Sequence, residues 1–278
     1  MAEILCSTGA LIGLPNGRNY RLLGDLAKQL TCDGIEFMMY NSWYEQVEEL
    51  TTYLQEVKLY IPVVHCEKKI GETISKGGQE YFAEAYRLFE INCKLAADVG
   101  AGKIVMHLWD GITSDAYFEN NMQAYPVLRD IATKYELDLL VENVVCNQKD
   151  PMLRFCQLAK EYSDIHFVFD TKMAAFHSQL ELLYEPEYAW LWKNGHIQHY
   201  HVNDYAGGHM DWVNLRTIPV GRGKIDFERF FEHVKSTDYD GTFTIEAPFY
   251  KEDGMPDVEV LNDQFGQVRK YITSNILF

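Results

Sequence analysis

Several apolar runs in this chain end on an ionisable side chain, which strongly constrains the fold. The runs DLLVENV, IHFVFDT, IQHYHVND and TFTIEAP carry Glu142, Asp170, His201 and Glu246 near their carboxyl ends. Short β-branched and aromatic runs of this kind predict buried parallel strands. Because an unpaired buried carboxylate is costly, packing alone is a poor explanation for an ionisable group in this position. We therefore interpret the four residues as parts of one polar site at the ends of strands.

The alternation of strand-like and helix-like segments predicts the fold class. Eight apolar runs are separated by stretches with apolar residues at helical spacing, which is the count of a closed (β/α)8 barrel of the α/β class. A doubly wound open sheet is the alternative, but the segment after the first strand, STGALIGLPNGRN, lacks the glycine spacing of a dinucleotide-binding turn. We expect strands at Ile4–Thr8, Gly34–Tyr40, Ile61–Glu67, Lys103–Trp109, Leu137–Val144, His166–Thr171, Ile197–Asp204 and Thr242–Ala247. We expect helices at Tyr20–Leu30, Trp43–Val57, Gln79–Val99, Ala116–Tyr135, Pro151–Tyr162, Glu187–Lys193, Phe227–Ser236 and Val258–Ser274.

Length and composition limit the domain count and the partners. No internal repeat or linker divides the 278 residues, so we expect one domain over 1–278, a length that barrels routinely occupy. A net charge of −16, from 41 acidic and 25 basic residues, disfavours nucleic acid and anionic membranes as partners. Six cysteines without a C-x-x-C pair, and no secretory or membrane-spanning segment, predict a cytoplasmic protein. The sequence leaves a homo-oligomer open.

The polar strand ends predict a metal site. In a parallel barrel the carboxyl ends of the strands converge on one face, where active sites lie. Three carboxylates and an imidazole there, from Glu142, Asp170, Glu246 and His201, would suit one divalent cation such as Mn²⁺, Mg²⁺, Co²⁺ or Zn²⁺. His199 shares the strand face of His201 but lies deeper, so we expect it to be a hydrogen-bonded core residue. We expect the nearby Asp204 to orient His201 or its loop.

Further polar residues near strand ends are candidates for contact with a substrate. His65 and His107 end the third and fourth predicted strands, and they would either donate hydrogen bonds to substrate or form a second metal position with Glu142. Trp109 would line the pocket or cap the core, and Arg222, Lys224 or Lys172 would contact substrate oxygens or a phosphate. The segment Tyr205–Asp226 is long for a connection, which predicts a lid or a substrate clamp. A small carbohydrate is the partner we expect.

Short motifs along the whole chain resemble those of the xylose isomerase-like TIM barrels. The matching segments are DGIEF, VVHC, IVMH, LLVEN, FVFDT, HVND, VGRGKIDF and FTIEAP. This superfamily includes sugar and sugar-phosphate isomerases and epimerases, inosose-processing enzymes and endonuclease IV. The resemblance implies that Glu142, Asp170, His201 and Glu246 hold one catalytic metal, and that the two glutamates also move protons. His65 and His107 match positions that bind a further zinc in the endonuclease IV branch.

The chain departs from the endonuclease branch in two places. The position three residues after Asp170, often His in the family, is Met173, and the loop segment NLRTIPVGRG lacks the expected Asp and His. A complete trinuclear zinc site and abasic-site cleavage are therefore disfavoured. We expect a metal-dependent isomerase or epimerase of a small sugar or polyol-ketone, phosphorylated or not, that acts through an enediolate. The alternatives are an inosose-type dehydratase, a phosphodiesterase and a non-catalytic sugar-binding protein.

Overall fold

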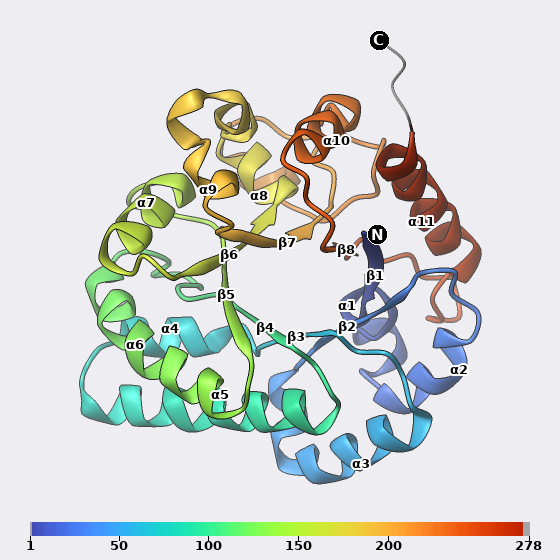
Figure 1. Ribbon diagram of the computed structural model, residues 1–278. Coiled ribbons are helices and arrows are strands. Elements are labelled where there is room, and N and C mark those ends of the chain that lie inside the picture. The colour runs from blue at the N-terminus through green and yellow to red at the C-terminus, as the bar shows by residue number, and fades with distance from the viewer. Residues whose placement is uncertain (1, 275–278) are drawn as a thin grey trace. The chain divides into compact units, whose positions relative to one another are not determined.

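The structure is a computed structural model that describes residues 2–274. Its strands are parallel and follow one another in sequence order around a closed barrel, with helices between them (Figure 1). The (β/α)8 class predicted from the alternation is thus confirmed. The strands are β1 (Glu3–Ser7), β2 (Gly34–Met38), β3 (Val63–His65), β4 (Lys103–Met106), β5 (Asp138–Glu142), β6 (His166–Asp170), β7 (Ile197–His201) and β8 (Thr242–Ile245).

All the strands except β1 are shorter than predicted, and β1 has the expected length but begins one residue earlier, at Glu3. Several of the helices are interrupted. The α-helices are α1 (Thr8–Leu11), α2 (Leu23–Ala27), α3 (Val47–Val57), α4 (Lys69–Ser75), α5 (Gln79–Asp98), α6 (Phe118–Lys134), α7 (Pro151–Glu161), α8 (Thr171–Phe176), α9 (Trp190–Lys193), α10 (Phe227–Ser236) and α11 (Val258–Thr273). Short 3₁₀ helices are η1 (Leu14–Asn16), η2 (Tyr20–Leu22), η3 (Asn41–Gln46), η4 (Leu180–Tyr184), η5 (Pro186–Tyr188) and η6 (Trp212–Asn214).

Three of the expected helices are split into a 3₁₀ turn followed by an α-helix. The helix predicted at Tyr20–Leu30 consists of η2 and α2, the one at Trp43–Val57 consists of η3 and α3, and the one at Glu187–Lys193 consists of η5 and α9. The helices α1, α4 and α8 were not predicted, because they are too short to show a hydrophobic period. No helix within residues 2–274 is both long and apolar enough to cross a bilayer.

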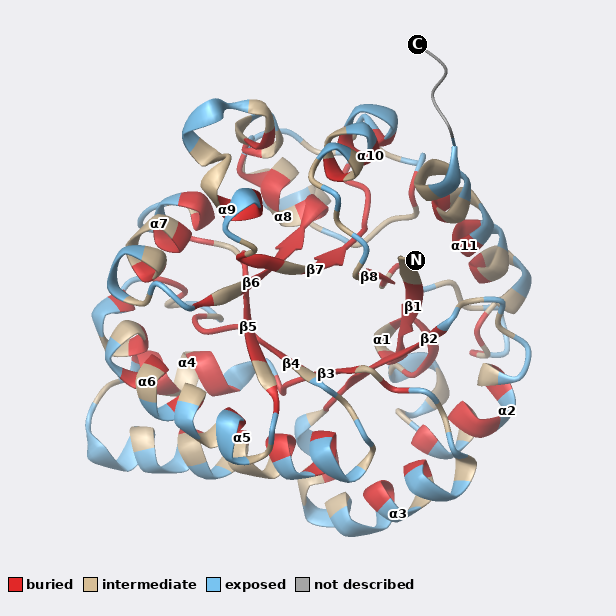
Figure 2. Cartoon of the chain, viewed as in Figure 1, coloured by how far each residue is buried: buried red, intermediate tan, exposed pale blue. Residues whose placement is uncertain are grey.

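The chain forms two compact units, which we describe separately. The central unit is Glu36–Phe169, and the terminal unit combines Met1–Ile35 with Asp170–Phe278. The expectation of a single domain over 1–278 stays a prediction. In both units the strands are buried and the helices expose one face (Figure 2). This burial explains why most residues of the strands are apolar.

In the central unit, β3, β4, β5 and β6 pair in parallel, with Glu142 of β5 opposite Val168 of β6. In the terminal unit, β8 lies between β7 and β1, and His201 is opposite Thr244. The parallel register brings the carboxyl ends of neighbouring strands to the same edge of each sheet. Each unit therefore collects its own set of polar residues at one edge.

A buried ion pair ties two loops of the central unit together. The Asp115 carboxylate accepts two hydrogen bonds from Arg154, at 2.9 and 2.6 Å, and three from the backbone N–H groups of residues 147–149. Burial alone would raise the pKa of Asp115, but these donors outweigh it and hold the pKa below its usual value. The Arg154 guanidinium also stacks on Phe118 at 4.2 Å. The loop after β5 is thereby fixed to the loop after β4.

Replacing Arg154 with Met should destabilise the protein by about 3 kcal/mol, because a buried carboxylate would lose its cation. The matched control is Arg129→Met, which removes an exposed pair with Asp164 and should cost less than about 1 kcal/mol. Chemical denaturation of the two variants and the wild-type protein measures the difference. Equal losses in both variants would show that the Asp115–Arg154 pair does not stabilise the fold as described.

Candidate active site

In the central unit, two imidazoles converge on one carboxylate. The Nε2 atoms of His65 and His107 lie 3.1 and 2.9 Å from Oε2 of Glu142. The two rings are 4.9 Å apart and nearly perpendicular. All three side chains are buried, at 5% exposure or less. The structure therefore brings together three residues that the sequence placed at the ends of three successive strands.

Each imidazole is also held on its other nitrogen. His65 Nδ1 lies 2.8 Å from the carbonyl oxygen of Cys66, which can only accept, so this nitrogen carries the hydrogen. His107 Nδ1 lies 2.9 Å from Oδ2 of Asp110, so it also donates. These outer partners fix the orientation of both rings. A carbonyl or carboxylate behind the imidazole is the usual support for a metal-ligating histidine.

The carboxylates decide the charge of His107. Burial alone would lower the pKa of His107, but the carboxylates of Glu142 and Asp110 outweigh it and raise the pKa to about 9. Burial would likewise raise the pKa of Asp110, but the charge and the hydrogen bond of His107 lower it. At neutral pH this raised pKa makes His107 a cation beside the buried Glu142 carboxylate.

This cluster fits a divalent cation. The ligand atoms of His65, His107 and Glu142 lie within 4.8 Å of one another. Two neutral imidazoles and one carboxylate are a donor set that suits Zn²⁺, Co²⁺ or Mn²⁺. A bound cation would replace the proton on His107 as the positive charge beside Glu142.

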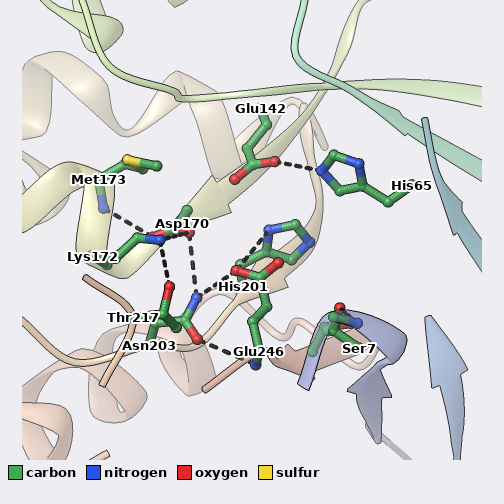
Figure 3. A network of polar contacts seen from close by, with 12 residues as sticks. Ser7, His65, Glu142, Asp170, Lys172, Met173, His201, Asn203, Thr217 and Glu246 are labelled. Atoms are coloured by element: carbon green, nitrogen blue, oxygen red, sulfur yellow. Dashed lines mark hydrogen bonds and ion pairs between the residues drawn. The ribbon is translucent and has the colours of Figure 1, made fainter. Parts of the chain in front are cut away.

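In the terminal unit, Asn203 connects two of the carboxylates (Figure 3). Its Nδ2 donates to Oε2 of Glu246 at 2.8 Å and lies 3.4 Å from Oδ2 of Asp170. Its Oδ1 accepts from the backbone N–H of Glu246 at 3.2 Å, so the amide holds both ends of this residue. Asp170 also caps α8 by accepting from the N–H of Met173 at 2.9 Å. The orientation of both carboxylates is therefore fixed by the surrounding chain.

The two histidines of β7 have different partners, as predicted from their positions along one face of the strand. His201 is fully buried, and its Nδ1 lies 3.8 Å from Oε2 of Glu246. His199 lies deeper, with Nδ1 at 2.5 Å from the Thr242 hydroxyl and Nε2 at 3.0 Å from the Thr244 hydroxyl. The prediction that His199 is a hydrogen-bonded core residue is confirmed. Of the four expected metal ligands, the terminal unit holds Asp170, His201 and Glu246, and the central unit holds Glu142.

Asp204 organises the long segment between β7 and α10. Its fully buried carboxylate accepts four backbone hydrogen bonds, from the N–H groups of Tyr205, Gly221, Gly223 and Ile225, at 2.7–3.1 Å. A Cβ atom on Gly223 would lie 2.3 Å from Asp204 Oδ1, so only glycine fits there. The expectation that Asp204 orients its loop is confirmed.

The residues expected to touch substrate lie in different surroundings. Trp109 is fully buried in the central unit, where it packs edge-on against Phe118 and donates to the carbonyl oxygen of Val145. Lys172 is buried in the terminal unit, beside Asp170. Arg222 is exposed on the turn of the long segment. Their contact with substrate stays a prediction.

Several residues of these two clusters were not predicted from the sequence. Asn203 lies two residues after His201 in HVND, and Asp110 lies three residues after His107 in HLWDG. The strand alternation could have indicated Asn203, since residues two apart share a face. No sequence pattern indicates that Asp110 turns back to His107, because that contact depends on the shape of the loop.

The chain belongs to the xylose isomerase-like TIM barrel family, which it matches over residues 25–268. No curated protein matches its sequence significantly.

Solved structures of sugar epimerases share the fold. The 3-keto-D-glucoside 4-epimerase of E. coli is 17% identical, with a TM-score of 0.70 over 97% of this chain and 100% of that chain. The D-allulose 3-epimerase of Methylomonas sp., in complex with D-allulose, is 14% identical, with a TM-score of 0.69 over 97% of each chain. The D-psicose 3-epimerase of Clostridium cellulolyticum H10, solved with D-tagatose, is 11% identical, with a TM-score of 0.70 over 98% of this chain and 100% of that chain. At these identities the likeness establishes the fold alone.

Replacing Asp204 with Ala should open the segment between β7 and α10, because four backbone N–H groups would lose their shared acceptor. We expect tryptic cleavage after the exposed Arg216 and Arg222 to accelerate about tenfold or more, given about 1–3 kcal/mol for each buried donor left unsatisfied. The control is Asp226→Ala, which removes only the cap of α10. Equal cleavage rates in the two variants would contradict the role assigned to Asp204.

Proposed function

We propose that this protein is a divalent-metal-dependent isomerase or epimerase of a small sugar or a related polyol-ketone. Membership of the xylose isomerase-like family supports an enzyme of this class. The sugar epimerases that share its fold support a carbohydrate substrate. The observation that carries the proposal is the set of three carboxylates and an imidazole at the carboxyl ends of β5, β6, β7 and β8, with Glu142, Asp170 and His201 buried and Glu246 partly exposed.

We propose that Glu142, Asp170, His201 and Glu246 hold one cation. The four donors are three carboxylates and an imidazole, and each follows or ends a strand of the barrel. Strand ends of a parallel barrel form the usual place for catalytic residues. A divalent cation bound there would act as a Lewis acid on the substrate carbonyl and hold adjacent oxygens in position.

The two glutamates are the proposed acid and base. One of them removes the proton from the carbon next to the carbonyl. In an epimerisation the other returns a proton to the opposite face of the same carbon; in an isomerisation it returns a proton to the former carbonyl carbon, while the hydroxyl proton passes to the former carbonyl oxygen. Asn203 supports this role for Glu246, because its Nδ2 donates to Oε2 and favours the ionised form. The Glu246 side chain is 11% exposed, against 3% for Glu142, which gives it the easier access to a substrate.

The cluster in the central unit supports a second cation as an addition to this proposal. His65, His107 and Glu142 present the donors, and each histidine is supported on its outer nitrogen. The second cation would be supported if the metal-loaded wild-type protein binds two equivalents of metal per chain and His65→Ala loses one of them. A dehydratase or phosphodiesterase would use the same residues, but no contact in residues 2–274 specifically favours either reaction.

Replacing Glu246 with Gln should slow the exchange of the substrate α-proton with solvent by about 10²–10⁴-fold, because the amide cannot accept a proton. The exchange is measured by NMR in D₂O with Mn²⁺-loaded protein and with D-tagatose or D-allulose as substrate. Metal content is measured on the same samples, and we expect the cation to stay bound.

The control is Glu228→Gln, which changes an exposed glutamate on α10 of the same unit and should leave the exchange unaltered. Exchange at the wild-type rate in Glu246→Gln, with metal bound, would refute the two-glutamate mechanism. A wild-type protein without any exchange on ketoses or related polyol-ketones would refute the proposed function.

A further inference from the structure

A buried ammonium group lies at the carboxyl end of β6. Lys172 is only 7% exposed, and it is the second residue of α8. Its Nζ lies 3.0 Å from the hydroxyl oxygen of Thr217 and 3.9 Å from Oδ2 of Asp170 (Figure 3). Lys172 therefore places its charge beside one of the proposed metal ligands.

The protein leaves most of the donors of this ammonium unused. An ammonium has three N–H groups, and the Thr217 hydroxyl accepts one of them. The Asp170 oxygen at 3.9 Å is beyond hydrogen-bond distance. Within residues 2–274, no other hydrogen-bond acceptor contacts Nζ. Two N–H groups of Lys172 thus remain available inside a buried site.

Thr217 adds a further donor at the same place. Its hydroxyl accepts from Lys172, so its own hydrogen is free to be donated to another group. Thr217 lies on the segment that Asp204 folds, one residue before Ile218, which pairs with Asp204 across an isolated bridge. The folding of the segment therefore decides where this hydroxyl lies.

Pairing with Asp170 alone does not explain the position of Lys172. A lysine that served only to neutralise Asp170 would approach within hydrogen-bond distance of the carboxylate. The Asp170 oxygens are instead contacted by the N–H of Met173 and by the amide of Asn203. Burial of an ammonium with so few partners is costly, and an additional acceptor would offset that cost.

We propose that Lys172 and Thr217 form a donor-rich subsite that binds an acceptor oxygen of the substrate, either a carbonyl or a carboxylate oxygen. This inference rests on the proposed function, since it assigns the subsite to the same active site. A group without hydrogens of its own suits three converging donors better than a hydroxyl does. Lys172 is thereby a determinant of substrate specificity.

The test compares ligand affinities of metal-loaded variants by isothermal titration calorimetry. The probes are D-tagatose, which offers a carbonyl oxygen, and D-glucuronate, which offers a carboxylate. Lys172→Met should weaken binding of the recognised probe about tenfold or more, the size expected for one lost hydrogen bond to a charged group. Thr217→Val should weaken it less, and Lys172→Arg should restore part of the affinity. Lys193→Met, at an exposed position in the same unit, is the charge-matched control.

Metal content and thermal stability of the same samples separate the outcomes. If Lys172→Met loses affinity for D-tagatose alone, the group that the subsite binds is a carbonyl. If it loses affinity for D-glucuronate, the group is a carboxylate. If metal-loaded Lys172→Met binds both probes with wild-type affinity, the proposed subsite is wrong, and the proposed function stays intact. If Lys172→Met loses its metal, the lysine acts on Asp170 instead, and this outcome would also overturn the proposed subsite. A wild-type protein that takes up no metal would overturn the proposed function and, with it, the subsite.

Discussion

The burial of carboxylates is the constraint on which the candidate site depends. A carboxylate out of contact with water must be compensated by a cation or by hydrogen-bond donors. In the central unit, Glu142 lies beside two imidazoles, of which His107 is held as a cation by Glu142 and Asp110 together. In the terminal unit, Asp170 and Glu246 share the amide of Asn203. The His65, His107 and Glu142 set has the spacing of a possible metal site.

The same physical rule produces a second kind of buried carboxylate, whose role is structural. The Asp204 carboxylate accepts hydrogen bonds from four backbone N–H groups. The Asp115 carboxylate accepts them from the Arg154 guanidinium and from three backbone N–H groups. Neither has a histidine among these partners. The two kinds differ in their partners: Asp204 and Asp115 are held by several backbone donors or a guanidinium, whereas Glu142 lies beside two imidazoles and Glu246 beside an amide.

Much of the fold could be predicted from the sequence, because buried parallel strands are apolar on both faces and their ends are marked by ionisable residues. The predicted strands are too long wherever an apolar run continues beyond the residues that pair with a neighbouring strand. An example is Ile61–Glu67, of which only Val63–His65 is a strand. Helices α1, α4 and α8 have seven residues or fewer, so no period marks them. The ionisable site residues at strand ends were predicted from their position, whereas Asp110 was not, because its contact with His107 depends on the shape of a loop. The roles of Asn203 and Thr217 were not, since an amide or hydroxyl is informative only once its neighbours are known.

Metal content is the most direct test of the account. The wild-type protein and His201→Ala should be loaded with mixed divalent ions, dialysed and measured for metal per chain by elemental analysis. We expect at least one tightly bound equivalent in the wild-type protein and the loss of one equivalent in His201→Ala, with both proteins folded. A wild-type protein that binds no metal, or a His201→Ala variant that keeps its full complement, would contradict a catalytic cation held by Glu142, Asp170, His201 and Glu246.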